Sequence, residues 1–196
     1  MTKRSNLFVL LASVTAIAFV VLLGEWKLNK KSIWDEIAEN SPLDAQRAAV
    51  FMAKESRLLT DAELSNLART IVSSREIKFS QAITNELIYK TQNSEAKKLA
   101  VYIAEQGFIA KGDILLSNRA ALEYKIGRFV PRNLEKATII FSSPTLKNVP
   151  ISKFYLAEIL LDNDNPKKDP KTAKELLTES ANSGIEAAKQ KLKELQ

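Results

Sequence analysis

The sequence contains no cysteine and no histidine, and these two absences exclude a large part of protein chemistry. Without them the chain cannot build a disulfide, a thiolate nucleophile, a Ser-His-Asp triad, or a Cys/His site for zinc or haem. We therefore expect no catalytic residue, no cofactor and no metal site, and the chain is not predicted to be an enzyme. Carboxylate pairs and Ser-Lys couples are compatible with the composition, so an enzyme that uses such groups stays an alternative.

The chain also lacks a strong charge of either sign. Its 29 Lys and Arg residues against 23 Asp and Glu residues give a formal net charge of +6, which is too mild to indicate a nucleic-acid partner. No basic cluster is interleaved with aromatic residues that could stack on bases. The sequence therefore predicts no nucleic-acid binding.

Residues 7–24 form a long hydrophobic run, LFVLLASVTAIAFVVLLG, with no charged residue in its 18 positions. As a helix this run would span about 27 Å, which is enough to cross a bilayer. Lys3 and Arg4 precede it, and Trp26 follows at the depth where amphipathic side chains favour the interface. We predict a transmembrane anchor at residues 1–24 and a juxtamembrane linker at residues 25–42.

A cleaved secretory signal is the competing interpretation of this run, because Ala16-Ile17-Ala18 resembles a cleavage site. Cleavage there would leave apolar residues of the run at the start of the mature chain, so an uncleaved anchor is favoured. Ala12 and Ala16 form a small-xxx-small pair through which two anchors could make a weak homodimer.

The charges on the two sides of the run are nearly balanced, and we expect the amino terminus inside and the bulk of the chain outside. Lys27, Lys30 and Lys31 follow the run on its carboxyl side. They give a second alternative for the function, in which the chain acts as an electrostatic anchor at the membrane surface.

Beyond residue 42 the apolar residues recur at helical spacing, and no convincing strand pattern is present. Thr60 and Glu63 form a capping box in front of one apolar stripe. Gly107 is expected to end a helix over residues 94–106 in the left-handed conformation. Weaker stripes predict further helices at residues 81–89, 114–126, 134–141, 152–161 and 186–195.

A strong set of helix boundaries lies near the carboxyl end, where Asp169 can cap, Pro170 suits the first helical position and Gly184 offers a stop. The predicted helices are about 8 to 13 residues long, which suits antiparallel pairs rather than a long coiled coil. Each stripe is too narrow to be stable alone. The predicted fold is therefore all-α, with a single N-terminal transmembrane helix followed by an α-solenoid of stacked antiparallel helix pairs.

Residues 127–137, GRFVPRNLEKA, resemble the signature of the Sel-one-like repeats, a branch of the tetratricopeptide-type helical repeats. That family has a G-x-G-V turn followed by a D-x-x-K-A helix start. Phe129 replaces the second glycine and Asn133 replaces the aspartate, although asparagine can also cap a helix. The residues that match are Gly127, Val130, Lys136 and Ala137.

A second copy of the pattern follows 36 residues later. Residues 104–107, AEQG, resemble the helix end of an earlier copy. On this resemblance the solenoid divides into degenerate helical repeats at residues 43–119 and Sel-one-like repeats at residues 120–196. The matching residues of the second copy are Asp169, Ala173, Ala181 and Gly184.

The resemblance implies an adaptor that binds other proteins, often in the bacterial cell envelope. In a bacterium, the predicted anchor and its orientation would make the chain a single-pass protein of the inner membrane with its bulk in the periplasm. Stacked helix pairs would present a concave surface to a peptide or a helix of a partner. Because aromatic side chains often anchor interfaces, Tyr102, Tyr124 and Tyr155 are candidate partner contacts, with packing inside the repeat as the alternative for each.

Two loops approach known ligand motifs without completing them. Residues 107–113 have the glycine spacing of a phosphate loop, but Asp113 stands where lysine is needed. Residues 162–165, DNDN, open like a calcium loop, but Pro166 and Lys167 occupy a ligand position and the position of the turn glycine. We interpret the first as a helix stop with a linker and the second as a polar turn between helices.

Overall fold

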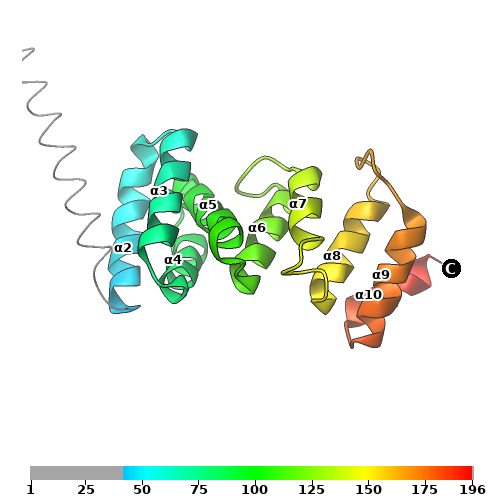
Figure 1. The fold of residues 1–196 in the computed structure, drawn as a ribbon. Helices are drawn as coiled ribbons and strands as arrows, with labels where there is room; N and C mark the ends of the chain where they lie inside the picture. Colours follow the sequence, from blue (N-terminus) through cyan, green and yellow to red (C-terminus); the bar gives the residue numbers. More distant parts are fainter. Residues whose placement is uncertain (1–41, 196) are drawn as a thin grey trace, which may run out of the picture. The chain divides into compact units, whose positions relative to one another are not determined.

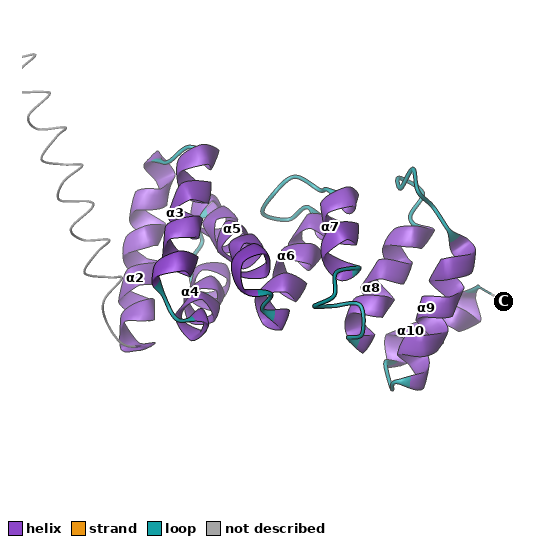
Figure 2. Ribbon diagram, viewed as in Figure 1, coloured by secondary structure: helices purple, strands orange, loops and turns teal. Residues whose placement is uncertain are grey.

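A computed structural model describes residues 42–195, and this part of the chain contains nine α-helices, one short 3-10 helix and no strand (Figure 2). The all-α prediction is confirmed. The helices are α2 (Pro42–Glu55), η1 (Ser56–Leu58), α3 (Asp61–Ser74), α4 (Ile77–Tyr89), α5 (Ser94–Lys111), α6 (Ile114–Ile126), α7 (Leu134–Phe141), α8 (Pro150–Leu161), α9 (Pro170–Asn182) and α10 (Glu186–Glu194).

Side-chain caps set several helix starts, as the sequence predicts. The Thr60 hydroxyl accepts a hydrogen bond from the Glu63 amide, and the Glu63 carboxylate accepts one from the Thr60 amide, so the capping box before α3 is confirmed. Asp169 caps α9 with Pro170 in its first turn. The predicted bounds of α6 and α7 agree with the structure at both ends.

The predicted stop at Gly107 is wrong, because α5 continues through it to Lys111 and ends at Gly112, which has φ 58°. Gly107 is instead a buried helical residue that faces α6. A Cβ atom added there would lie 3.0 Å from Leu116 Cβ and closer still to the end of that side chain. The glycine therefore permits the close approach of α5 and α6, and the helix stop predicted at Gly107 lies five residues later, at Gly112.

Consecutive helices from α3 to α10 follow one another along this unit, and from α4 onward each packs on the next (Figure 1). Alternate helices also touch, since α2 packs on α4 and α3 on α5. Lys153, near the start of α8, forms an ion pair with Glu179, near the end of α9. These two neighbouring helices therefore run antiparallel. The described helices thus have the character of a helical repeat.

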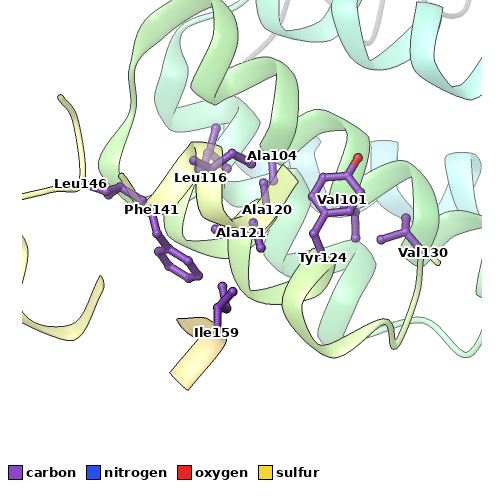
Figure 3. Close-up of a cluster of buried hydrophobic side chains, with 12 residues drawn as sticks. Val101, Ala104, Leu116, Ala120, Ala121, Tyr124, Val130, Phe141, Leu146 and Ile159 are labelled. Atoms are coloured by element: carbon purple, nitrogen blue, oxygen red, sulfur yellow. The ribbon is translucent and has the colours of Figure 1, made fainter. Parts of the chain in front are cut away.

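A buried hydrophobic cluster joins α5, α6, α7 and α8 (Figure 3). A second cluster joins α8, α9 and α10, and the partly buried ring of Tyr155 packs against both. The residues labelled in Figure 3 are Val101, Ala104, Leu116, Ala120, Ala121, Tyr124, Val130, Phe141, Leu146 and Ile159. The second cluster consists of Phe154, Ala157, Ala173, Leu177, Ala181 and Ala188.

The predicted anchor at residues 1–24, including Ala12 and Ala16, and nearly all of the predicted linker at residues 25–42, including its lysines, lie outside the described residues. Among the residues that are described, no helix combines the length and the apolar character that crossing a membrane requires. The boundary that the sequence places between residues 119 and 120 falls inside α6, which packs on both α5 and α7.

Candidate functional site

The two copies of the repeat pattern have the same backbone geometry at the starts of α7 and α9. The Asn133 amide donates to the Tyr124 carbonyl over 2.8 Å, and the Asp169 amide donates to the Leu160 carbonyl over 3.0 Å. Asn133 has φ −146° and ψ 90°, while Asp169 has φ −140° and ψ 86°. Each side chain caps its helix through the amide three residues later.

The other signature residues lie where helices approach each other or where the chain turns. Ala137 and Ala173 are fully buried, and Ala181 is buried near the end of α9. Gly127 and Gly184 have φ 78° and 92°, a region that glycine enters without strain. Val130 is buried against the cluster of α5 to α8. These residues form the framework of the repeat.

Lys136 completes a polar link between three successive helices. Its Nζ lies 2.8 Å from Glu105 Oε1 on α5 and 3.2 Å from the Tyr124 hydroxyl on α6, while that hydroxyl donates to Glu105 Oε2 over 2.7 Å. Burial, and then the hydrogen bond to Glu105, raise the pKa of Tyr124. The hydroxyl therefore stays protonated at neutral pH and serves as a donor.

The three tyrosines predicted as candidate contacts differ in their surroundings. Tyr124 is buried, and its ring packs in the core. Tyr102 is half-buried, and burial followed by the charge of Asp61 raises its pKa. The Tyr155 ring lies 5.7 Å from the Phe141 ring and 5.4 Å from the Phe154 ring, centroid to centroid. The structure does not bring the three rings together on one exposed surface.

An exposed apolar stripe runs along α6 instead. Leu115 is 65% exposed and Ile126 is 49% exposed, and Leu122 is partly exposed between them. Positions 115, 122 and 126 lie seven and four residues apart, which places them on one side of a helix. The opposite side of α6 is buried, and its buried residues include Leu116, Ala120 and Ala121. We call the surface that Leu115, Leu122 and Ile126 form the α6 face.

On the α4 side, the α6 face is bordered by charged and aromatic groups. Arg119 Nη2 donates to the Tyr89 hydroxyl over 2.5 Å, and Tyr89 is 63% exposed. The fully buried carboxylate of Glu123 pairs with Arg128 and lies 3.8 Å from Arg119 Nη1. Two guanidinium groups thus share one carboxylate, and the hydrogen bond to Glu123 raises the pKa of Arg128.

On the α8 side, the α6 face is bordered by polar links. The Ser152 hydroxyl bonds to Asn118 Oδ1 over 2.8 Å, and Lys125 Nζ lies 3.0 Å from Glu158 Oε2. These links, together with the hydrogen bond of Arg119 to Tyr89, connect α6 to α4 and to α8. The α6 face is therefore presented by a braced helix rather than by a loop.

Sequence reasoning missed the α6 face because it searched for aromatic residues. The signal was present, since residues 114–126 are apolar on both sides of the helix, whereas a surface helix has one apolar side. Such a helix either lies in the interior or exposes one of its apolar sides. Only the packing of α6 against α5 and α7 shows which side stays outside.

The two carboxylates of the DNDN loop form ion pairs with an arginine. Asp162 and Asp164 both pair with Arg132, which belongs to the turn before α7. The buried Asn165 amide donates to the Ile159 carbonyl over 2.9 Å. Across the described residues, no group of three or more acidic side chains could hold a metal ion.

Comparison of the chain with protein-family models, with curated proteins and with solved structures found no match.

Proposed function

We propose that this chain is a membrane-anchored helical-repeat adaptor that holds a protein partner in the bacterial cell envelope. The single observation that carries the proposal is the α6 face, an exposed apolar stripe on a helix that its neighbours brace on both sides. Leu115 and Ile126 lie near opposite ends of the same side of α6, and an exposed apolar side of a helix is typical of a binding surface.

The chemistry of the α6 face favours a protein ligand. An amphipathic helix or an extended peptide could lay apolar side chains on Leu122 and Ile126, and the exposed Tyr89 ring lies against Arg119 on the same helix. Arg119 lies on the same side of α6, four residues after Leu115, and is already oriented by Tyr89 and Glu123, so a partner would lose little entropy in ordering it. Aromatic and arginine residues around an apolar centre are typical of interaction hot spots.

The proposed repeat family rests on the equivalence of the two turns. Caps, loop-closing hydrogen bonds and buried alanines recur 36 residues apart, as the resemblance to Sel-one-like repeats implies. Proteins built from such repeats bind partners along the surface of the stack. Tyr102 and Tyr155 stay candidate partner contacts, as predicted from the sequence.

The proposed anchor rests on the uncharged run at residues 7–24. A single-pass inner-membrane protein with its bulk in the periplasm would hold the α6 face near the bilayer and raise the local concentration of its partner. Intact-mass analysis of the protein from the membrane fraction tests the anchor. A mature chain that begins at or after Phe19 would contradict it.

Crosslinking in the native membrane, followed by mass spectrometry, tests the adaptor proposal. We expect a reproducible envelope protein to crosslink to the wild-type chain and to be lost when residues 120–196 are deleted. The double variant Leu122→Glu and Ile126→Glu should weaken the crosslink about tenfold or more, because charges would replace two apolar contacts.

The matched control replaces Ile109 and Ile139 by Glu, since both are exposed isoleucines away from α6. This control should leave the crosslink unchanged. Neutralising Lys27, Lys30 and Lys31 should also leave it unchanged. If the lysine variant abolished the crosslink and the α6 variant did not, the electrostatic anchor would replace the adaptor as the explanation.

A further inference from the structure

A pocket of about 610 Å³ lies between α2, the carboxyl end of α4 and the turn that leads to α5. It is separate from the α6 face and shares no residue with it. Its volume falls within the range of roughly 300–1,000 Å³ that is typical of sites for small molecules. A pocket of this size is large enough to hold a small molecule.

The wall of the pocket is fixed before any ligand arrives. Asn93 is buried, and its amide nitrogen donates to the Ala53 carbonyl and to the Ser56 hydroxyl. Its side-chain oxygen accepts from the amides of Glu95 and Ala96 over 2.9 and 3.3 Å. One side chain thus ties the end of α2 to the start of α5, so the pocket is preformed.

The floor of the pocket is apolar, and its side chains are small. Ala49 and Ala53 lie on one side of α2, and Val50 beside them is 73% exposed. These alkyl groups leave room above α2 that a larger apolar body could fill. Burying their exposed surface under such a body removes apolar area from water and so favours the complex.

Three cations stand around this floor. Lys54, Arg57 and Lys90 line the pocket, and all three are exposed. None of them belongs to an ion pair among the described residues. Glu86 is the acidic residue of the lining, so the cations exceed the carboxylates by two. An anionic group placed among the three would meet unpaired positive charge.

An apolar floor with cations at its edge fits one class of ligand. We propose that this pocket binds a single-chain anionic amphiphile, whose alkyl body covers Ala49, Val50 and Ala53 and whose carboxylate lies among Lys54, Arg57 and Lys90. The proposal does not depend on the adaptor function, because it uses none of the residues of the α6 face. A neutral amphiphile would cover the apolar floor but would not interact with the three cations.

A photoreactive dodecanoic acid analogue, applied to the full-length protein in nonionic detergent, tests the site by peptide mapping. We expect the label in residues 46–57 and 86–93, with competition by unlabelled dodecanoate. A photoreactive dodecanol of equal length should label this site about tenfold less, since three exposed cations together contribute about 1–2 kcal/mol to anion binding. Labelling spread evenly over the chain would overturn the proposal.

The triple variant Lys54→Gln, Arg57→Gln and Lys90→Gln should reduce labelling by dodecanoate about tenfold and leave labelling by dodecanol unchanged. Val50→Glu should reduce labelling by both probes. The matched control is Lys147→Gln, Lys171→Gln and Lys174→Gln, three exposed lysines elsewhere. Circular dichroism verifies that each variant is folded.

Two further outcomes would overturn the proposal. In the first, the triple variant of the pocket and its control label equally with dodecanoate. In the second, a Glu-rich amphipathic peptide displaces the probe at a lower concentration than dodecanoate does, which assigns the pocket to a protein segment. Neither outcome bears on the α6 face, whose variants are tested separately by crosslinking.

Discussion

The turns that lead into α7 and α9 reach the same end point by different routes. In the first, Gly127 turns the chain at φ 78° and Val130 fills the space below. In the second, no residue has positive φ, and the buried amide of Asn165 holds the loop on the Ile159 carbonyl. Both turns still close with a hydrogen bond across nine residues and a side-chain cap. The cap and the buried alanine therefore define the repeat, and the glycine does not.

The sharpest test of this comparison is to enlarge the buried alanine in each copy. Ala137→Leu and Ala173→Leu should each lower the free energy of unfolding by about 2–3 kcal/mol, because both side chains are fully buried between helices. Urea denaturation measures the effect. Ala110→Leu, at an exposed position of α5, is the control and should change it by less than about 0.5 kcal/mol. A loss in one copy alone would break the equivalence.

A smaller effect is expected where a glycine is replaced. Gly127→Ala should cost about 2 kcal/mol, because a left-handed residue would gain a Cβ atom 2.8 Å from Arg132 Cβ and 3.0 Å from its amide nitrogen. Gly184 has φ 92° and open space around it, so Gly184→Ala should cost only about 1 kcal/mol. Thermal unfolding of the two variants compares them. Equal costs would show that the contact with Arg132 does not matter.

The second turn should depend on Asn165 in place of a glycine. Asn165→Ala removes the hydrogen bond to the Ile159 carbonyl and should destabilise the protein by about 1 kcal/mol. Asn163→Gly places glycine at the position equivalent to Gly127, and urea denaturation should show little change. A clear stabilisation by Asn163→Gly would mean that this turn, too, prefers a glycine.

The smallest expected effect separates the two caps by pH. Hydrogen bonds from the Thr172 hydroxyl and amide hold the pKa of Asp169 below its ordinary value. Its contribution to stability is therefore present above the unfolded pKa and is lost as the pH falls through the folded pKa. Urea denaturation of wild type and Asp169→Asn should differ at pH 6 and converge in acid. Asn133→Asp should introduce the same pH dependence at α7, and its absence there would distinguish the two caps.

Much of this fold is predictable from local chemistry. Thr60, Asn133 and Asp169 mark helix starts correctly because a cap depends on residues within one turn. The prediction that Gly107 ends a helix was wrong because the role of this glycine depends on its contact with Leu116 on another helix, which the local sequence pattern does not contain. The α6 face and the pocket beside α2 depend on which sides of the helices find neighbours. Lining residues such as Val50 and Lys90 are far apart in the sequence, and no motif connects them.

The ring of Tyr155 has a consequence for how the chain opens. It packs against the cluster of α5 to α8 and also against the smaller cluster of α8 to α10, which consists of two leucine- or phenylalanine-sized side chains and four alanines. This cluster has six buried residues where the other has twelve, so we expect α9 and α10 to open while α5 and α6 stay closed. Amide protons of α9 and α10 should then exchange with solvent ahead of those in α5. Opening of α9 and α10 would expose the side of the Tyr155 ring that packs against the smaller cluster, while the other side stays packed against the larger one. We therefore expect local unfolding from the carboxyl end to stop at Tyr155.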